Sequence, residues 1–151
     1  MSSLSAIPIR VEPAGLAGAG IGGGIAALLS EIASHLEGLA AGGEPAAIDL
    51  RGLPMSAAER QRLREALGPG EVRIVLEAAG ESSIEETAVQ GVWWIEHRTP
   101  DGALIASYIE IARVPGILIV PDEELARGAA KLRNTAEFFS GAQGESLHGT
   151  T

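Results

Sequence analysis

The sequence predicts an α+β fold: an antiparallel β-sheet, built as a meander of about four strands, with helices packed mainly on one face. Amphipathic helical patterns flank a contiguous block of extended segments, and short turns join those segments at hairpin spacing. The block is not interleaved with helices, as a parallel sheet would require. At 151 residues, without an internal repeat, the chain has the size of one domain.

Two helices and a short strand are predicted before this block. Apolar residues recur over residues 25–39 at the spacing of one helix face, and two glycines end the pattern. Residues 45–50, PAAIDL, suggest an edge strand. Ser56 with Glu59 three residues later is a capping-box signature. It opens a second helix through Leu67, which Gly-Pro-Gly then stops.

The predicted strands and the end of the chain follow from turn signals and composition. Four extended segments occupy residues 71–79, 83–89, 91–98 and 103–112, residues 115–121 add a short extended piece, and a third helix begins at Asp122. The composition of both ends is typical of mobile or disordered segments. We therefore expect a flexible arm over 1–20, a single domain over 21–139 and a disordered tail over 140–151.

The register of the hairpin at residues 91–112 is predicted from its turn, TPDG. Pro100 presets φ and Gly102 can adopt a left-handed conformation, which is typical of a type I turn with a glycine bulge. This register pairs Thr99 with Ala103. If it holds along the whole hairpin, the expected core face carries Trp93, Ile95, Ile105, Ile109 and Ile111.

The opposite face of this predicted hairpin carries an aromatic pair among carboxylates. Trp94 is expected to face Tyr108, with Glu86, Glu96 and Glu110 nearby. One interpretation is a pair that stabilises a half-solvated sheet face. The other is a partner-binding patch, because exposed Trp and Tyr are common interface anchors and the carboxylates favour a partner with Lys or Arg.

Composition and charge restrict the classes of function. The net charge is −9, with 20 acidic and 11 basic residues and no basic stripe, which argues against nucleic acid as a partner. There is no cysteine, so the chain itself has no disulfide, thiolate metal ligand or thiol nucleophile. The N-terminus does not resemble a signal peptide, and no apolar run approaches the roughly 18 residues of a membrane span. We expect a cytoplasmic protein without membrane insertion.

The remaining motifs favour no catalytic, cofactor-binding or metal-binding residue. A G-x-G-x-x-G match at Gly18, Gly20 and Gly23 lacks the tight strand-to-helix turn of a nucleotide-binding loop and is better explained as a flexible lead into a helix. The three histidines are scattered, and the acids at residues 122–124 suit the start of a helix. The sequence therefore predicts that the protein is not an enzyme.

Four ordered motifs nevertheless carry a family resemblance. They lie in IDLRGLPMSAAERQRLREALGPGEV, IEETAVQGVWWIEHRTPDG and SYIEIARVPGIL, and read IDL-x-x-LP, LG-x-GEV, ET-x-x-x-GVW and IE-x-x-x-VP. The sequence resembles the C-terminal conserved domain of the HupH/HyaF hydrogenase expression proteins over about residues 25–135. Members of that family are often about twice this length and carry related segments in two halves, whereas this chain has one such unit.

The resemblance implies a non-catalytic chaperone or scaffold for expression, maturation or assembly of an [NiFe] uptake hydrogenase. The expected partners are a hydrogenase subunit, in particular the iron–sulfur small subunit, and other hydrogenase accessory proteins. No cofactor is expected. The alternative, motivated by the single unit, is a homo-oligomerising interaction module, such as a homodimer, with a different protein client.

Overall fold

The structure, a computed structural model, describes residues 21–145 of the chain. The chain divides into two compact units between Gly116 and Ile117. The first unit contains a β-sheet with two helices, and the second contains a single long helix, α3 (Asp122–Glu145). A short 3-10 helix, η1 (Gly116–Leu118), lies at the junction, where the sequence predicted an extended piece.

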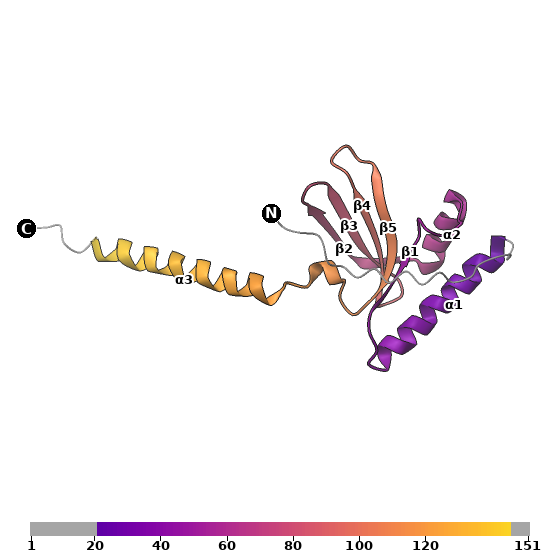
Figure 1. Ribbon diagram of the computed structural model, residues 1–151, viewed down its shortest axis with the longest axis horizontal. Helices are drawn as coiled ribbons and strands as arrows, with labels where there is room; N and C mark the ends of the chain where they lie inside the picture. The colour runs from indigo at the N-terminus through magenta and orange to yellow at the C-terminus, as the bar shows by residue number, and fades with distance from the viewer. Residues whose placement is uncertain (1–20, 146–151) are drawn as a thin grey trace, which may run out of the picture. The chain divides into compact units, whose positions relative to one another are not determined.

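The sheet has five antiparallel strands in the order β1-β5-β4-β3-β2 (Figure 1). The α+β class is thus confirmed, with one strand more than the predicted four, because the expected edge strand pairs with the last strand of the meander. The strands are β1 (Ala46–Asp49), β2 (Pro69–Glu77), β3 (Glu81–Thr87), β4 (Val92–Arg98) and β5 (Leu104–Ile111).

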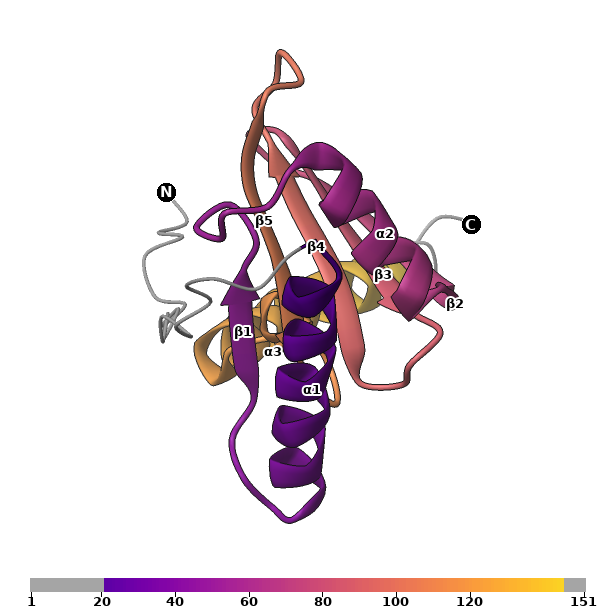
Figure 2. The same ribbon diagram turned by 90° about the vertical axis from the view of Figure 1, so that its right-hand side faces the viewer.

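Two helices, α1 (Ile21–Ala40) and α2 (Ala57–Leu67), lie against one face of this sheet (Figure 2). The predicted capping box starts α2, where the Ser56 hydroxyl accepts from the Glu59 N–H and the Glu59 carboxylate accepts from the Ser56 N–H. The core cluster between helices and sheet consists of Leu28, Ile32, Leu39, Ile48, Leu50, Leu63, Leu67, Val92, Trp94, Ile109 and Ile111.

The hairpin of β4 and β5 begins as its turn predicts. The Thr99 N–H donates to the Ala103 carbonyl at 2.9 Å, Gly102 has φ of 90°, and Arg98 pairs with Leu104. One residue further, however, His97 pairs with Ala106, so that Ile105 has no partner across the ladder. Ile105 is therefore a β-bulge, an extra residue on one strand of the pair.

This bulge makes the predicted register wrong for the rest of the hairpin. Trp94 pairs with Ile109 and Trp93 pairs with Glu110, whereas the sequence predicted Trp93 opposite Ile109 and Trp94 opposite Tyr108. A shift of one residue exchanges the faces of the sheet, because side chains alternate along a strand. Trp94 therefore lies in the core beneath the helices, and Trp93 points to the other face.

The predicted core changes accordingly. Ile109 and Ile111 belong to the core cluster as expected, but Ile105 is 54% exposed. Trp93 and Ile95 are buried, but they lie on the face opposite to the helices rather than in that cluster.

The second unit contains the third predicted helix at its predicted start. α3 begins at Asp122 and continues to Glu145, six residues past residue 139, where the sequence predicted that the domain ends. The expected arm over residues 1–20 and residues 146–151 of the expected tail lie outside the residues that the structure describes.

Candidate partner-binding surfaces

The five residues predicted to form one patch lie on two faces of the sheet. Trp94 and Glu96 point to the helix-covered face, whereas Tyr108, Glu110 and Glu86 alternate to the other. Trp94 is 2% exposed and Tyr108 is 6% exposed, so neither aromatic ring offers an open surface. The predicted Trp94–Tyr108 pair is absent because the Ile105 bulge shifts the register, and Trp94 is held instead by groups around α2.

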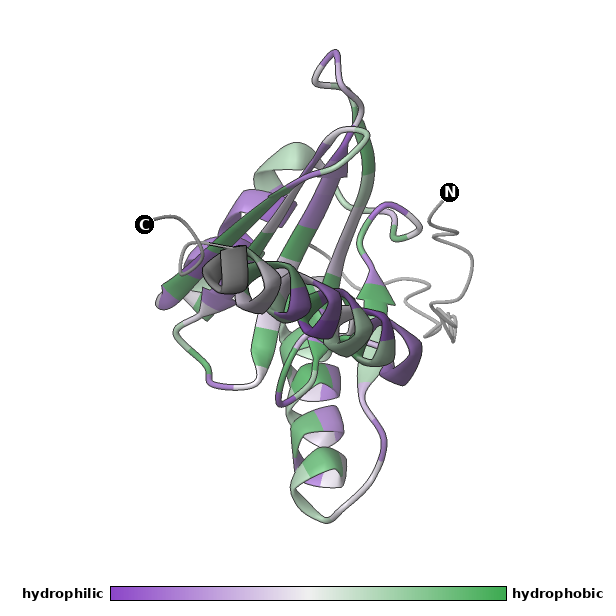
Figure 3. Cartoon of the chain, turned by 90° about the vertical axis from the view of Figure 1, so that its left-hand side faces the viewer, coloured by the Kyte–Doolittle hydropathy of each residue, from purple (hydrophilic) through white to green (hydrophobic). Residues whose placement is uncertain are grey.

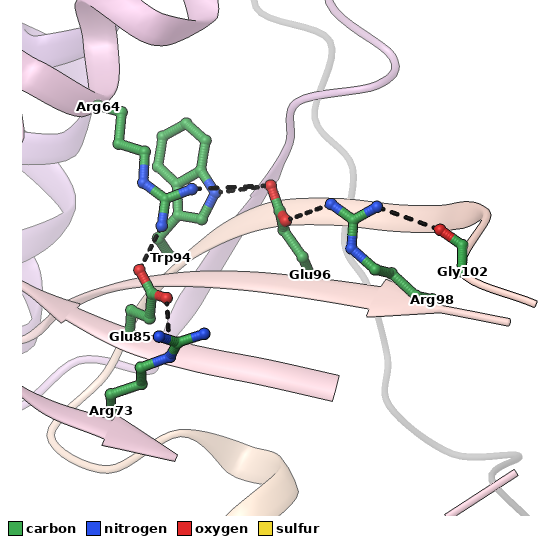
Figure 4. A network of polar contacts seen from close by, with 7 residues as sticks. All are labelled: Arg64, Arg73, Glu85, Trp94, Glu96, Arg98 and Gly102. Atoms are coloured by element: carbon green, nitrogen blue, oxygen red, sulfur yellow. Dashed lines mark hydrogen bonds and ion pairs between the residues drawn. The ribbon is translucent and has the colours of Figure 1, made fainter. Parts of the chain in front are cut away.

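Trp94 lies within a network of charged side chains between α2 and the sheet (Figure 4). The guanidinium of Arg64, on α2, lies 5.1 Å from the centroid of the Trp94 ring, within the range of a cation–π interaction. Arg64 also forms an ion pair with Glu85 on β3. The indole N–H of Trp94 donates to the Glu96 carboxylate at 3.2 Å.

Two further arginines extend this network at the sheet surface. Arg73 on β2 lies 3.3 Å from the Glu85 carboxylate, and Arg98 lies 3.1 Å from that of Glu96. The Arg98 guanidinium also donates to the Gly102 carbonyl at 3.3 Å, which ties the turn to β4. Both carboxylates are therefore balanced by cations within the chain, so the predicted role of Glu96 in attracting a basic partner loses support.

A cleft of about 220 Å³ opens beside this network, between α2 and the ends of β3 and β4. Trp94 and Arg64 form part of its lining, and carboxylates come from Glu65 and Glu85, whereas Glu86 borders the cleft with its side chain on the opposite face of the sheet. Glu65 is exposed, whereas Arg64 and Glu85 pair with each other. Trp94 is 2% exposed and Glu85 is paired, so the open acidic group of the cleft is Glu65, which suits a short peptide segment carrying Lys or Arg.

The other face of the sheet carries a row of hydrogen-bonded polar groups. His97 lies 2.7 Å from the Ser82 hydroxyl through Nδ1 and 3.2 Å from the Tyr108 hydroxyl through Nε2. Trp93 donates from its indole N–H to the Ala112 carbonyl at 3.0 Å. The Glu110 carboxylate accepts from the Gly116 N–H at 2.8 Å, which holds the chain after β5.

Burial changes the proton affinities along this row. It lowers the pKa of His97, which favours the neutral imidazole at pH 7. Burial, with the nearby Glu110 carboxylate, raises the pKa of Tyr108 to about 12. Burial also raises the pKa of Glu110 itself, against the opposing hydrogen bond from Gly116. These shifts keep the aromatic hydroxyl protonated and the imidazole uncharged.

This row resembles a catalytic triad in composition but not in chemistry. A nucleophilic serine needs a base whose cationic form is stabilised by a third group, normally a carboxylate. Here the group beyond His97 is the protonated phenol of Tyr108, which does not supply that charge. The Ser82–His97–Tyr108 row therefore fits a structural ladder across β3, β4 and β5.

The single tyrosine of the chain allows this environment to be measured directly. Because the folded-state pKa of Tyr108 lies above its ordinary value of 10.0, the folded state retains the proton more strongly. Stability from this group is present below pH 10 and is lost as the pH rises toward about 12. We expect an ultraviolet titration of the tyrosinate to show a midpoint near 12 in the folded protein and near 10 in denaturant. A folded-state midpoint near 10 would contradict the burial of Tyr108.

Other candidate sites receive no support within residues 21–145. No three His, Asp or Glu side chains in this part come together as a metal site. Gly18 and Gly20 of the glycine motif lie outside the described residues, and Gly23 belongs to the first turn of α1. None of the described helices is both long enough and apolar enough to cross a bilayer.

Comparison with protein families decides the classification. A family model described as the HupH hydrogenase expression protein, C-terminal conserved region, matches residues 24–139. The chain belongs to this family. Among solved structures, the hydrogenase expression protein HupH from Thiobacillus denitrificans ATCC 25259 is 42% identical, with a TM-score of 0.71. That match covers 76% of this chain and 96% of the solved chain.

Curated relatives of this HupH-family chain are longer proteins. The hydrogenase-1 operon protein HyaF of Escherichia coli (strain K12) is 32% identical over 116 residues, which is 76% of this chain and 40% of HyaF. The hydrogenase expression/formation protein HoxQ of Azotobacter vinelandii is 30% identical over 93 residues, 62% of this chain and 33% of HoxQ. The chain thus spans about a third to two fifths of these relatives.

The α2 cleft was missed in the sequence because its residues come from separate elements. Arg64 and Glu85 are 21 positions apart, and no periodicity links a helix position to a strand position across a sheet. No sequence signal favoured the observed face. The face predicted from the turn carries five large apolar residues, whereas the observed face carries Val92, Trp94, Ile109 and Ile111.

Proposed function

We propose that this HupH-family chain is a non-catalytic accessory protein, a chaperone or scaffold that acts in the expression, maturation or assembly of an [NiFe] uptake hydrogenase. The observation that carries the proposal is the family match over residues 24–139. The names of HyaF and HoxQ, which refer to a hydrogenase operon and to hydrogenase expression/formation, support the same role. We place this activity in the cytoplasm.

The client that the family resemblance implies is the iron–sulfur small subunit. A chain without cysteine offers no thiolate to compete for the client's iron–sulfur clusters or for nickel. Its net charge of −9 favours encounter with a basic segment of the client. Both properties suit a protein that holds an unfinished subunit without performing chemistry on it. Other hydrogenase accessory proteins are further proposed partners.

The surface that we assign to the client is the α2 cleft, defined by Arg64, Glu65, Glu85, Glu86 and Trp94. Of the predicted partner-binding residues, Trp94 lies on the cleft side of the sheet, whereas Glu86 borders the cleft and points to the other face. Glu65 is exposed at the cleft and has no arginine among its contacts in the described part of the chain, so its charge remains available to a basic residue of the client. Its only polar contact there is with Gln61, one turn earlier on α2.

A pull-down from hydrogenase-producing cells tests the function and the surface separately. We expect the tagged chain to retain a hydrogenase subunit and Glu65→Lys to retain at least about threefold less, because it places a cation where a client cation would bind. The matched control is Glu37→Lys, which makes the same charge change at an exposed position of α1. Equal retention by both variants would reject the α2 cleft. Failure of the unchanged chain to enrich any hydrogenase subunit would reject the function.

A further inference from the structure

The helix of the second unit presents an apolar stripe on an exposed surface. Every residue of α3 over 122–142 is exposed, including Leu125 at 57%, Leu132 at 71% and Phe139 at 64%. Figure 3 shows hydrophobic and hydrophilic residues along this helix. An isolated helix gains little stability from its sequence alone, and most helices depend on packing of their apolar face. The stripe on α3 is therefore a candidate contact surface.

The spacing of the stripe indicates what kind of partner this is. The stripe consists of Leu125, Ala129, Leu132, Ala136 and Phe139, at successive intervals of four, three, four and three. Phe138, which is 72% exposed, lies beside Phe139 and outside this spacing. This is the a/d spacing of a heptad, which packs one helix against another. Two full heptads are present, and the larger side chains recur every seven residues with alanines between them. A surface with this period fits a second helix of the same period.

We propose that α3 pairs with α3 of a second copy of this chain as an antiparallel two-helix interface. Charge decides the orientation. The first turn of α3 carries Asp122, Glu123 and Glu124, and its last turn has no basic residue. A parallel pair would bring six carboxylates together at one end, which is repulsive. An antiparallel pair separates the two acidic ends and sets each helix dipole against the opposite end of its partner.

The residues beside the stripe allow the two helices to approach closely. The flanking positions Ala126, Gly128, Thr135, Ser140 and Ala142 are small, and Arg133 is the one long side chain among them. In an antiparallel arrangement the leucine and phenylalanine of one helix can pack against the alanines of the other, as large residues opposite small ones. The basic residues Arg127 and Lys131 remain on the outer surface, where they keep the dimer solvated.

Sedimentation of the full chain over a range of concentrations tests the association. We expect a reversible monomer–dimer equilibrium and at least a tenfold rise in the dissociation constant for Leu132→Glu, which buries a charge at the centre of the stripe. The control is Asn134→Glu, the same introduced charge on the opposite face of α3, which is expected to leave the constant within about twofold. Thermal unfolding of the sheet unit checks that both variants fold.

Spin labels test the orientation, because the chain has no cysteine and each introduced one is unique. Single labels at Glu123→Cys and Asn134→Cys report the distance between the two copies near the end and near the middle of the stripe. An antiparallel pair places the Glu123 labels farther apart than the Asn134 labels by on the order of 10 Å, given a rise of about 1.5 Å per residue. A parallel pair makes the two distances similar.

Three outcomes would overturn the proposal. One is a strict monomer, which would mean that the stripe docks on its own chain or waits for another protein. The second is a dimer that persists in Leu132→Glu, and the third is a pair of similar label distances. Loss of hydrogenase retention in Leu132→Glu, with the chain monomeric throughout, would assign the stripe to the client instead. None of these results affects the test of the α2 cleft.

Discussion

Replacing Trp94 with alanine is expected to lower the free energy of unfolding by about 3–5 kcal/mol, the usual cost of removing a buried tryptophan from a core. The side chain is 2% exposed and packs in the core cluster with Val92, Ile109 and Ile111. The variant also removes the ring beneath the Arg64 guanidinium and the donor to Glu96. Urea denaturation followed by circular dichroism measures the effect.

The matched control for this prediction is Ile105→Ala. The register predicted from the turn places Ile105 in the core, whereas the bulge leaves it 54% exposed. We expect this substitution to change the unfolding free energy by less than about 1 kcal/mol, as is usual for exposed positions. If Ile105→Ala were as costly as Trp94→Ala, the hairpin would lack the bulge and the assignment of the two faces would be wrong.

Replacing Leu63 with alanine is expected to cost about 2–5 kcal/mol, the range for a leucine in a close-packed core. Leu63 is fully buried and, with Leu67, fixes the apolar side of α2 against the sheet. Because α2 also positions Arg64 over Trp94, the loss should loosen the α2 cleft before the sheet unfolds. Hydrogen exchange measured by mass spectrometry would show this as faster exchange in α2 than in β4.

The neighbouring substitution Arg62→Ala is the control for Leu63. Arg62 is exposed on the same helix, and alanine has a slightly higher helix propensity. We expect its unfolding free energy to remain within about 0.5 kcal/mol of the unchanged chain. A small effect at Leu63, comparable to that at Arg62, would mean that α2 does not depend on the sheet for its stability.

Local features of this fold could be predicted because each depends on residues close together in the chain. The capping box of α2 needs Ser56 and Glu59, and the turn after β4 needs Pro100 and Gly102. Both are present as predicted. The edge position of β1 followed in the same way from a short apolar segment.

The faces of the sheet could not be predicted from the turn, because the bulge at Ile105, three residues after Gly102, shifts the register of the hairpin. The Ile105 bulge leaves the carbonyl of this residue free to accept from the Arg51 guanidinium, which lies 54 positions earlier. A contact of this kind depends on the assembled fold and leaves no local pattern. The predicted pairing of Trp94 with Tyr108 is wrong because of this bulge.

The sequence analysis predicted the helix that begins at Asp122, but neither its heptad stripe nor the exposure of that stripe. Periodicity shows which residues share a helix face, and only the structure shows that Leu132 and Phe139 are uncovered. The α2 cleft differs from the α3 stripe, because its residues share no sequence periodicity and come together only in the folded chain.

The proposed accessory role in hydrogenase maturation is tested most directly by deleting this coding sequence from a hydrogenase-producing cell. The quantity to measure is the ratio of hydrogenase activity to the transcript level of the hydrogenase structural subunits. The accessory role predicts that this ratio falls and that expression of the unchanged chain restores it, because an accessory protein acts on the subunits after their genes are transcribed. An unchanged ratio in the deleted strain would contradict the account.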